Sequence, residues 1–321
     1  MKRQDEIGAL DALHQPVYMV GQAQFKCRGG VLPLFTNGSL SQPSQPWQTV
    51  LIIVHGRKRN AGDYFDVASH MVEGTDTSTL IIAPQFLTHV DIKAHGLGND
   101  YLYWDQLGWM GGDDALGPES ISGFSVFDDL IEYLSDCSRF PDLRRIIIAG
   151  HSGGGQVVHR YAVLSGTTAD IHFIVANPSS YVYFSKDRVN EQGFFIPSED
   201  AYPGYNSWKY GMENRPAYGQ GYSDKLLEER YVARNVTYLL GACDSNPEHP
   251  ALDRTAPAMA QGMHRLGRGR AYWRYLQERH GPALHHRYFE IPGVGHDPLG
   301  IFTTLVARAS LFEQTSHRGA K

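Results

Sequence analysis

Gly150-His151-Ser152-Gly153-Gly154 is the most informative stretch of this chain. It follows the largely apolar run 145–149 and precedes a helix-like segment, 156–164. A strand, a Gly-x-Ser-x-Gly turn and a helix together form a nucleophile elbow. The turn is so tight that small residues are required two positions before and two after the serine. It raises the Ser152 hydroxyl above the sheet edge, where a histidine and a substrate carbonyl can both reach it.

Two other loops that join a strand to a helix fit this stretch less well. A phosphate-binding loop requires Gly-x-x-x-x-Gly-Lys-Ser/Thr, and no lysine follows the glycines here. The dinucleotide-binding pattern Gly-x-Gly-x-x-Gly does not start at Gly150, because position 152 is serine. A chance match in a glycine-rich loop is the remaining alternative, and the flanking strand and helix favour the elbow over it.

Strand-like and helix-like segments alternate along the chain, which predicts an α/β fold with a mainly parallel central sheet flanked by helices. The 321 residues are enough for one such domain with an insertion, and we expect residues 1–321 to form a single domain. Besides the elbow strand, the expected strands are 50–54, 79–83, 171–176, 236–240 and 287–291, and the expected helices are 61–72, 121–135, 258–276 and 301–312.

The composition argues against several classes of protein. A net charge of -5 without a basic block gives nucleic-acid binding little support. No apolar run approaches the roughly 20 residues that are needed to cross a membrane. The three cysteines are widely spaced, so neither a disulfide framework nor a zinc site is expected. The start, 1–6, is not followed by an apolar core, and we expect a cytoplasmic protein unless a cleaved signal peptide is missing from the sequence.

Two stretches interrupt the alternation. The first, 85–118, is rich in glycine, and the second, 179–234, has no clear period but many aromatic residues. A loop this long inside a compact domain is usually a lid or a binding element. We therefore expect 179–234 to be an inserted lid that walls the substrate pocket, although a surface insertion that only packs on the sheet is the alternative. The candidate substrate-binding residues are Trp104, Trp109, Tyr181 and Trp208.

A serine nucleophile needs a histidine to take its proton and an acid to orient that histidine. The chain holds 15 histidines, so their positions must decide among them. His296 lies in the glycine-rich loop 292–297, directly after the last expected strand, from which an imidazole can reach a serine at another strand end. His151 adjoins the serine, but adjacent side chains at a sharp turn diverge, while His285 and His286 precede their strand. His296 is the predicted base.

The acid should follow a strand that lies between the elbow and His296 in the sequence. Asp244 comes just past strand 236–240, whereas the preceding strand ends in Asn177, which is not a carboxylate. Asp253, nine residues further along, is the second candidate. The alternative interpretation of Asp244 is a turn-forming aspartate that caps its own backbone.

An oxyanion hole needs two backbone N–H groups aimed at the developing negative oxygen. Gly153, which follows the serine and opens the helix, supplies one. The second is expected from His55-Gly56-Arg57, the loop after strand 50–54, with Arg57 as the first choice and Gly56 as the second. A plain turn that ends the strand is the alternative interpretation of this loop.

The elbow, the acid and the histidine loop resemble those of the α/β-hydrolase family of serine hydrolases, in the order Ser, Asp, His that is typical of it. The resemblance spans about Val50 to Phe312. Within it, 176–181, 259–262 and 292–297 look like a poorly characterised group of bacterial and fungal hydrolases that is distantly similar to polyhydroxyalkanoate depolymerases and feruloyl esterases. The resemblance implies an α/β-hydrolase fold and acyl transfer to water through an acyl-enzyme, without naming the acyl group.

These residues together predict a serine hydrolase that cleaves carboxylic esters, either small molecules or polymers, without a cofactor or a metal. An amidase or peptidase with the same triad is the alternative, disfavoured because no cluster of acidic residues marks an amine-binding pocket. A non-catalytic protein of the same fold is disfavoured because all three triad residue types are present. A metal-dependent hydrolase is disfavoured because no His-Glu-x-x-His or related ligand spacing occurs.

Overall fold

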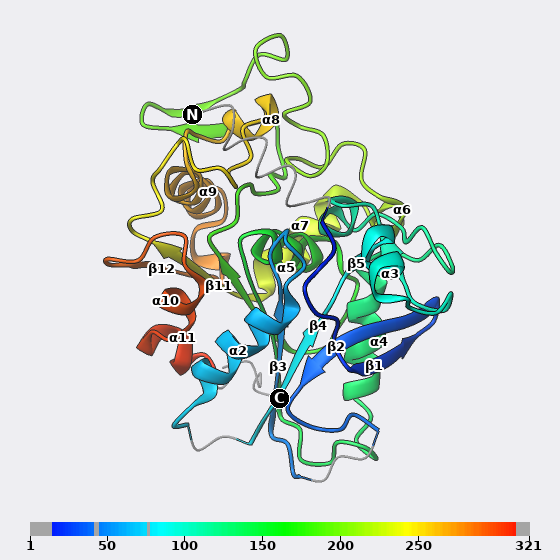
Figure 1. The fold of residues 1–321 in the computed structure, drawn as a ribbon. Coiled ribbons are helices and arrows are strands. Elements are labelled where there is room, and N and C mark those ends of the chain that lie inside the picture. Colours follow the sequence, from blue (N-terminus) through cyan, green and yellow to red (C-terminus); the bar gives the residue numbers. More distant parts are fainter. Residues whose placement is uncertain (1–14, 42–44, 76–77, 313–321) are drawn as a thin grey trace.

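The computed structural model describes residues 15–41, 45–75 and 78–312, so the first residues, where no signal peptide is expected, lie outside the described part. An eight-stranded sheet runs through the molecule with helices on both of its faces (Figure 1). In the order in which they pair, the strands are β1 (Ala23–Cys27), β2 (Gly30–Thr36), β4 (Thr79–Pro84), β3 (Thr49–Val54), β7 (Arg145–His151), β8 (Ile171–Ala176), β11 (Asn235–Gly241) and β12 (Arg287–Ile291).

The sheet is parallel from β4 to β12 and antiparallel only at β1 and β2. Strands β3, β4 and β8 are buried along their whole length. Such strands read as continuous apolar runs in the sequence, which is why they could be predicted. The predicted mainly parallel sheet is confirmed, and the antiparallel strands β1 and β2 at its edge were not predicted. Because the carboxyl ends of parallel strands lie at the same edge of a sheet, the loops after β3, β7, β8, β11 and β12 meet there.

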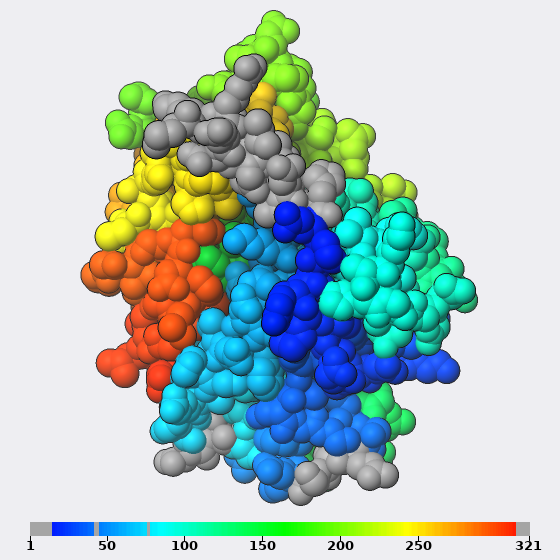
Figure 2. Space-filling model, in the orientation of Figure 1, coloured from blue at the N-terminus to red at the C-terminus, as the bar shows by residue number. Residues whose placement is uncertain are grey.

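Two layers of helices cover the sheet. Helices α2 (Ala61–Val72), α10 (Pro298–Phe302) and α11 (Leu305–Ala309) pack on one face, and helices α4 (Ser125–Leu134), α5 (Gly153–Leu164), α7 (Asp224–Ala233) and α9 (Arg265–His280) pack on the other. Strand β3 shows the alternation that feeds both cores, because Leu51 and Ile53 face the first layer and Val50 and Ile52 face the second. Figure 2 shows the first face, with α2 between the orange to red C-terminal helices and the dark blue N-terminal strands.

Three predicted helices differ from the observed ones. The predicted helix 258–276 is divided into the short α8 (Ala256–Met259) and α9, which are separated at Gly262, whose φ of +134° no helix accommodates. The predicted helix 301–312 is also divided, since α10 ends at Phe302 and Thr304 caps the start of α11 by accepting from the Ala307 N–H. Helix α4 begins later than predicted, at Ser125. Short elements complete the fold: β5 (Leu87–Thr88), α3 (His89–His95), β6 (Tyr103–Trp104), η1 (Gly108–Gly111) and η2 (Gly281–Ala283).

The segment 179–234 contains more regular structure than its sequence indicates. It includes the two-stranded hairpin of β9 (Arg188–Asn190) and β10 (Gly193–Phe195), the short α6 (Ala217–Gln220) and α7. Strand β9 packs against α9, and the light green part of the segment lies beside α8 at one end of the molecule (Figure 1). Its first residues are core residues, because Tyr181, Val182 and Tyr183 are all 0% exposed.

Candidate active site

Ser152 occupies the tight turn between β7 and α5. Its φ is 57°, in the left-handed region that a non-glycine residue adopts only under strain. The Ser152 N–H donates to the Ala176 carbonyl at 2.9 Å, and the Gln156 N–H donates to the Ser152 carbonyl at 3.0 Å, so β8 and the first turn of α5 hold the strained residue from both sides.

The glycines around Ser152 are required by close backbone contacts. A Cβ atom on Gly150 would lie 2.4 Å from the Gly154 carbonyl carbon, and one on Gly154 would lie 2.0 Å from the Val54 carbonyl oxygen. Neither obstacle is a flexible side chain, so the backbone itself would have to move. The Gly-x-Ser-x-Gly pattern is therefore explained by the packing of the elbow against β3.

Three of the predicted site residues lie in one hydrogen-bonded row. The distance from Ser152 Oγ to His296 Nε2 is 2.9 Å, and the distance from His296 Nδ1 to Asp244 Oδ2 is 2.7 Å. The loops after β7, β11 and β12 bring these side chains together at the carboxyl ends of the parallel strands. With its proton on Nδ1, the imidazole donates to the carboxylate and can accept the serine proton at Nε2.

Asp253, the second candidate for the acid, is engaged elsewhere. Its Oδ2 accepts from the Tyr210 hydroxyl at 2.7 Å, and its Oδ1 accepts from the Thr255 hydroxyl at 2.7 Å. In the part of the chain that the structure describes, Asp244 is the carboxylate that bonds to His296. The geometry therefore favours Asp244 over Asp253.

Arg265 holds the second oxygen of Asp244. Its Nη1 donates to Asp244 Oδ1 at 3.3 Å, both side chains are buried, and its Nε donates to Ser179 Oγ at 3.1 Å. Burial raises the pKa of Asp244, but the hydrogen bond from His296 and the charges of His296 and Arg265 outweigh it and leave the pKa below its ordinary value. No motif in the sequence indicated Arg265, which lies 21 residues from Asp244.

Two further histidines pack against His296. The His151 ring lies 4.5 Å from the His296 ring between centroids, and the His249 ring lies 5.0 Å away. Burial lowers the pKa of His151 well below its ordinary value, and burial with the Arg265 charge lowers that of His249 to about 4. Both rings are therefore neutral at pH 7 and present no full charge to His296.

The pKa of His296 reflects opposing influences. Burial lowers it, the hydrogen bond and charge of Asp244 raise it, and the charges of Arg265 and Arg57 lower it. The balance lies below the ordinary value of 6.5. His296 is therefore neutral at pH 7, the state in which it can act as a base.

Asn177 links the loops that carry the row. Its Oδ1 accepts from the Gly241 N–H at 2.8 Å, and its Nδ2 donates to the Gly295 carbonyl at 3.2 Å and lies 3.3 Å from His151 Nε2. Gly241 ends the strand before Asp244, Gly295 precedes His296, and His151 precedes Ser152. One side chain thus contacts the backbone or neighbour of each triad residue, a role that its position at a strand end did not reveal.

The predicted oxyanion donors lie next to each other. A Cβ atom on Gly153 would be 2.8 Å from the Arg57 nitrogen and 2.8 Å from the Met110 sulfur. The Tyr64 hydroxyl packs against Gly56, where a Cβ atom would lie 2.9 Å from it. Since the Arg57 nitrogen is the backbone nitrogen that lies against Gly153, the geometry favours the Arg57 N–H as the partner of the Gly153 N–H. Met110 contacts the same point, and the sequence did not indicate it.

Three predicted substrate-binding residues are core residues instead. Trp104 is 1% exposed, while Trp109 and Tyr181 are 0% exposed. The Trp109 ring stacks on Phe86 and the Tyr181 ring stacks on Tyr272. Large aromatic side chains serve equally well in a core and in a pocket wall, so the sequence could not separate the two roles. This corrects the predicted contact of these three side chains with substrate.

Trp208 differs from the other three. It is half-buried, and its Nε1 donates to the Gly111 carbonyl at 2.7 Å. Gly111 follows Met110, which lies against Gly153. Trp208 therefore remains a candidate for substrate contact.

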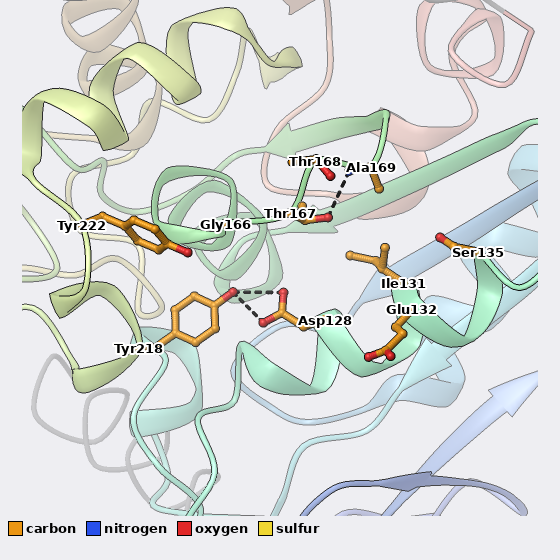
Figure 3. Close-up of a pocket in the computed structure, with 10 residues that line it drawn as sticks. All are labelled: Asp128, Ile131, Glu132, Ser135, Gly166, Thr167, Thr168, Ala169, Tyr218 and Tyr222. Carbon is orange, nitrogen blue, oxygen red and sulfur yellow. Dashed lines mark hydrogen bonds between the residues drawn. The ribbon is translucent and has the colours of Figure 1, made fainter.

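A separate pocket of about 560 Å³ lies at the other end of α5 (Figure 3). It is lined by Asp128 and Tyr218, whose hydroxyl bonds to the Asp128 carboxylate at 2.8 Å, and by residues 166–169, which follow α5. Ser152 precedes the first residue of α5 and Gly166 comes after its last, so the helix separates them by roughly 18 Å at 1.5 Å per residue. This pocket does not belong to the serine site.

Two features are absent from residues 15–41, 45–75 and 78–312. Within these ranges, no group of three or more His, Cys, Asp and Glu side chains is arranged to hold a metal ion. No helix in them is long and apolar enough to cross a membrane.

The chain is similar to known proteins over most of its length. The α/β hydrolase family matches residues 51–302. The poly(aspartic acid) hydrolase-1 of Sphingomonas sp. KT-1 is 20% identical, with a TM-score of 0.66 over 93% of this chain and 100% of that chain. LpqC, a poly(3-hydroxybutyrate) depolymerase of Bordetella parapertussis, is 19% identical, with a TM-score of 0.61 over 93% of this chain and 92% of that chain. No curated protein matches the chain.

These similarities confirm the resemblance found in the sequence and the predicted fold, including the likeness to polyhydroxyalkanoate depolymerases. At 20% and 19% identity, the two solved structures speak for the fold alone. The family match covers more than half of the chain. The chain therefore belongs to the α/β hydrolase family.

Proposed function

We propose that this α/β hydrolase is a serine hydrolase that cleaves carboxylic esters. The observation that carries the proposal is the hydrogen-bonded row from Ser152 Oγ through His296 to Asp244. A serine in this arrangement is activated because the histidine takes its proton as it attacks. The ester preference rests on the sequence, in which no acidic cluster marks an amine-binding pocket.

The proposed reaction has two halves. Ser152 Oγ attacks the ester carbonyl while His296 Nε2 takes the hydroxyl proton, and the Gly153 and Arg57 N–H groups stabilise the oxyanion. Collapse of the tetrahedral intermediate breaks the bond to the alcohol, which leaves with the proton from His296. Water then attacks the acyl-enzyme with His296 again as the base, which releases the acid and restores Ser152.

Asp244 would orient His296 and stabilise its charged form during both halves. Its low pKa keeps it a carboxylate at the pH at which His296 is neutral, so both residues have the protonation states that the reaction requires.

The middle of the inserted segment 179–234 would form one wall of the substrate site. Its first residues are core, but Trp208 is half-buried and bonds to Gly111, next to Met110. The single-domain arrangement, with 179–234 as an insertion, remains part of this proposal.

A panel of substrates tests the proposal. It comprises aryl esters of graded acyl length, aminoacyl amides and polyester particles, with the Ser152→Ala variant as the blank and a fluorophosphonate as a covalent probe of Ser152. Turnover of esters that the variant lacks supports the proposal. Turnover of amides without esters would assign the triad to an amidase, and unlabelled Ser152 with no turnover would contradict the proposed nucleophile.

A further inference from the structure

His249 lies beside the proposed base but takes no part in the proposed reaction. Its ring centroid is 5.0 Å from that of His296, whose Nε2 is 2.9 Å from Ser152 Oγ. The His249 side chain is half-buried and follows the exposed stretch 245–248. Only the His296 ring therefore separates His249 from the nucleophile, and a molecule that enters the site can reach it.

The contacts of His249 Nδ1 determine where the ring carries its proton. The Ala251 N–H donates to Nδ1 at 3.1 Å, and Arg265 Nη2 lies 3.5 Å from the same atom. Both partners are donors, so Nδ1 is an acceptor without a proton. Burial and the Arg265 charge lower the pKa of His249 to about 4, so at pH 7 the neutral ring carries its one proton on Nε2.

The Nε2–H of His249 is a donor on the serine side of the triad. Nδ1 faces Arg265, which holds Asp244 at the acid end. The two nitrogens of an imidazole point in widely different directions, so Nε2 points away from that end. Among the residues that the structure describes, none accepts a hydrogen bond from His249 Nε2. The donor is therefore available to a substrate.

The contacts around Ser152 place His249 on the side of the leaving alcohol. The Arg57 nitrogen, a proposed oxyanion donor, lies against Gly153, and Arg57 Nη2 donates to the Pro250 carbonyl at 3.3 Å. In the proposed reaction, the carbonyl oxygen points at the oxyanion donors, and the alcohol oxygen must approach His296 to receive its proton. The atoms beside the alcohol oxygen are thus the part of the ester that comes within reach of His249.

We propose that His249 Nε2–H donates a hydrogen bond to an acceptor oxygen in the alcohol part of the ester. An ether, hydroxyl or carbonyl oxygen a few bonds from the ester oxygen can accept it, whereas an alkyl group would leave the donor unpaired. The inference rests on the proposed esterase function and makes its substrate class specific: esters of alcohols that carry a second oxygen. His249 is then a specificity-determining residue.

Matched butyrate esters test the inference. The first pair is 2-methoxyethyl and butyl butyrate, and the second is 3-methoxypropyl and pentyl butyrate. In each pair an ether oxygen replaces one methylene. A pH-stat measures kcat/KM for each ester, and hydroxide-catalysed hydrolysis gives the intrinsic reactivity ratio of each pair. The wild-type ether-to-alkyl ratio of kcat/KM should exceed the hydroxide ratio in at least one pair.

His249→Phe keeps an aromatic ring but removes the donor. It should lower the ether-to-alkyl ratio of the preferred pair by roughly 3- to 10-fold, as expected for one neutral hydrogen bond. His249→Gln, whose amide N–H can replace Nε2–H, should restore part of the ratio. An unfolded fraction cancels in a ratio that is measured on one preparation, and His249→Leu carries the same expectation if His249→Phe does not fold.

His70→Phe is the control, because His70 is an exposed histidine of α2 that pairs with Glu73 at 3.3 Å. It should leave the ether-to-alkyl ratio of both pairs unchanged.

An equal loss on both members of each pair in His249→Phe overturns the inference and assigns His249 a packing role against His296. A wild-type ratio at or below the hydroxide ratio in both pairs overturns it as well. In either case, turnover of butyl butyrate and fluorophosphonate labelling of Ser152 would still support the proposed function. Failure of the proposed function looks different, since none of the four esters would then be hydrolysed, and the inference would fall with it.

Discussion

Arg265 Nη1 lies 3.3 Å from Asp244 Oδ1, so the buried carboxylate is held between a guanidinium on one oxygen and His296 on the other. The arginine has two electrostatic effects on the row. It stabilises the ionised form of Asp244, and it opposes the protonated form of His296. Arg265 thus keeps the proposed base unprotonated and its partner ionised over the same range of pH.

We predict that Arg265→Gln moves the acid limb of the kcat/KM profile to higher pH. The rate should rise with pH as His296 loses its proton, and the structure puts that pKa below 6.5, whereas an ordinary histidine would put it at roughly 6 to 7.5. Losing the guanidinium removes a charge that lowers the pKa of His296, so the pKa must rise. Arg274→Gln, which alters an exposed arginine of the same helix, is the control. An acid limb that stays in place in Arg265→Gln would contradict the prediction.

Ser152→Ala should lose at least on the order of 1000-fold in kcat, because it removes the hydroxyl that the proposed mechanism uses as the nucleophile. Covalent labelling by a fluorophosphonate should disappear with it. The substitution removes one part-buried oxygen, which bonds to His296 at 2.9 Å, and leaves the backbone of the turn unchanged, so it should not disturb the fold. Labelling that persists at full extent in the variant would place the nucleophile at another residue.

Asp244→Asn and Asp253→Asn should differ sharply in activity. Asp244 accepts from His296 Nδ1 at 2.7 Å, and an amide there can stabilise the wrong tautomer of the imidazole, at a cost on the order of 10⁴-fold in kcat. Asp253 bonds to Tyr210 and Thr255, so its variant should change kcat far less. Steady-state kinetics on one neutral aryl ester checks the ranking, and the reverse order would assign the acid to Asp253.

The parts of the fold that could be predicted from the sequence are those encoded locally. The strands β3, β4 and β8 are short, mainly apolar runs, and the elbow is a motif of five consecutive residues. The candidates Ser152, Asp244 and His296 follow three other predicted strands, β7, β11 and β12. The rule that the carboxyl ends of parallel strands lie at one edge of the sheet was enough to bring them together. No contact between distant residues had to be known.

The parts that could not be predicted depend on contacts between distant residues. Arg265 meets Asp244 from the start of a helix, and nothing in its neighbourhood distinguishes it from the other arginines of α9. Trp109 and Tyr181 were expected to face substrate, but their rings stack on Phe86 and Tyr272, from other segments of the chain. In a segment without helix or strand periodicity, the sequence does not show whether an aromatic side chain will be buried in the core or exposed to substrate.

Asn177→Gly should lower kcat by roughly 10- to 100-fold while changing KM little. The variant removes the side chain that links the loops of all three triad residues. The rate of attack is sensitive to small displacements of the reacting groups. Glycine is the right replacement, since Asn177 has a φ of 42°, where alanine would add backbone strain of its own.

Asn177→Asp gives a second, independent readout. It keeps the acceptor for the Gly241 N–H but places a negative charge beside His151, whose ring lies against His296. That charge favours the imidazolium, so the acid limb of the kcat/KM profile should move to higher pH in this variant. Asn190→Gly, in the hairpin of β9 and β10, is the control and should leave both kcat and the profile unchanged. A role in folding alone would lower the thermal midpoint of Asn177→Gly without changing kcat of the folded enzyme or the pH profile of Asn177→Asp, and that outcome would refute the positioning role.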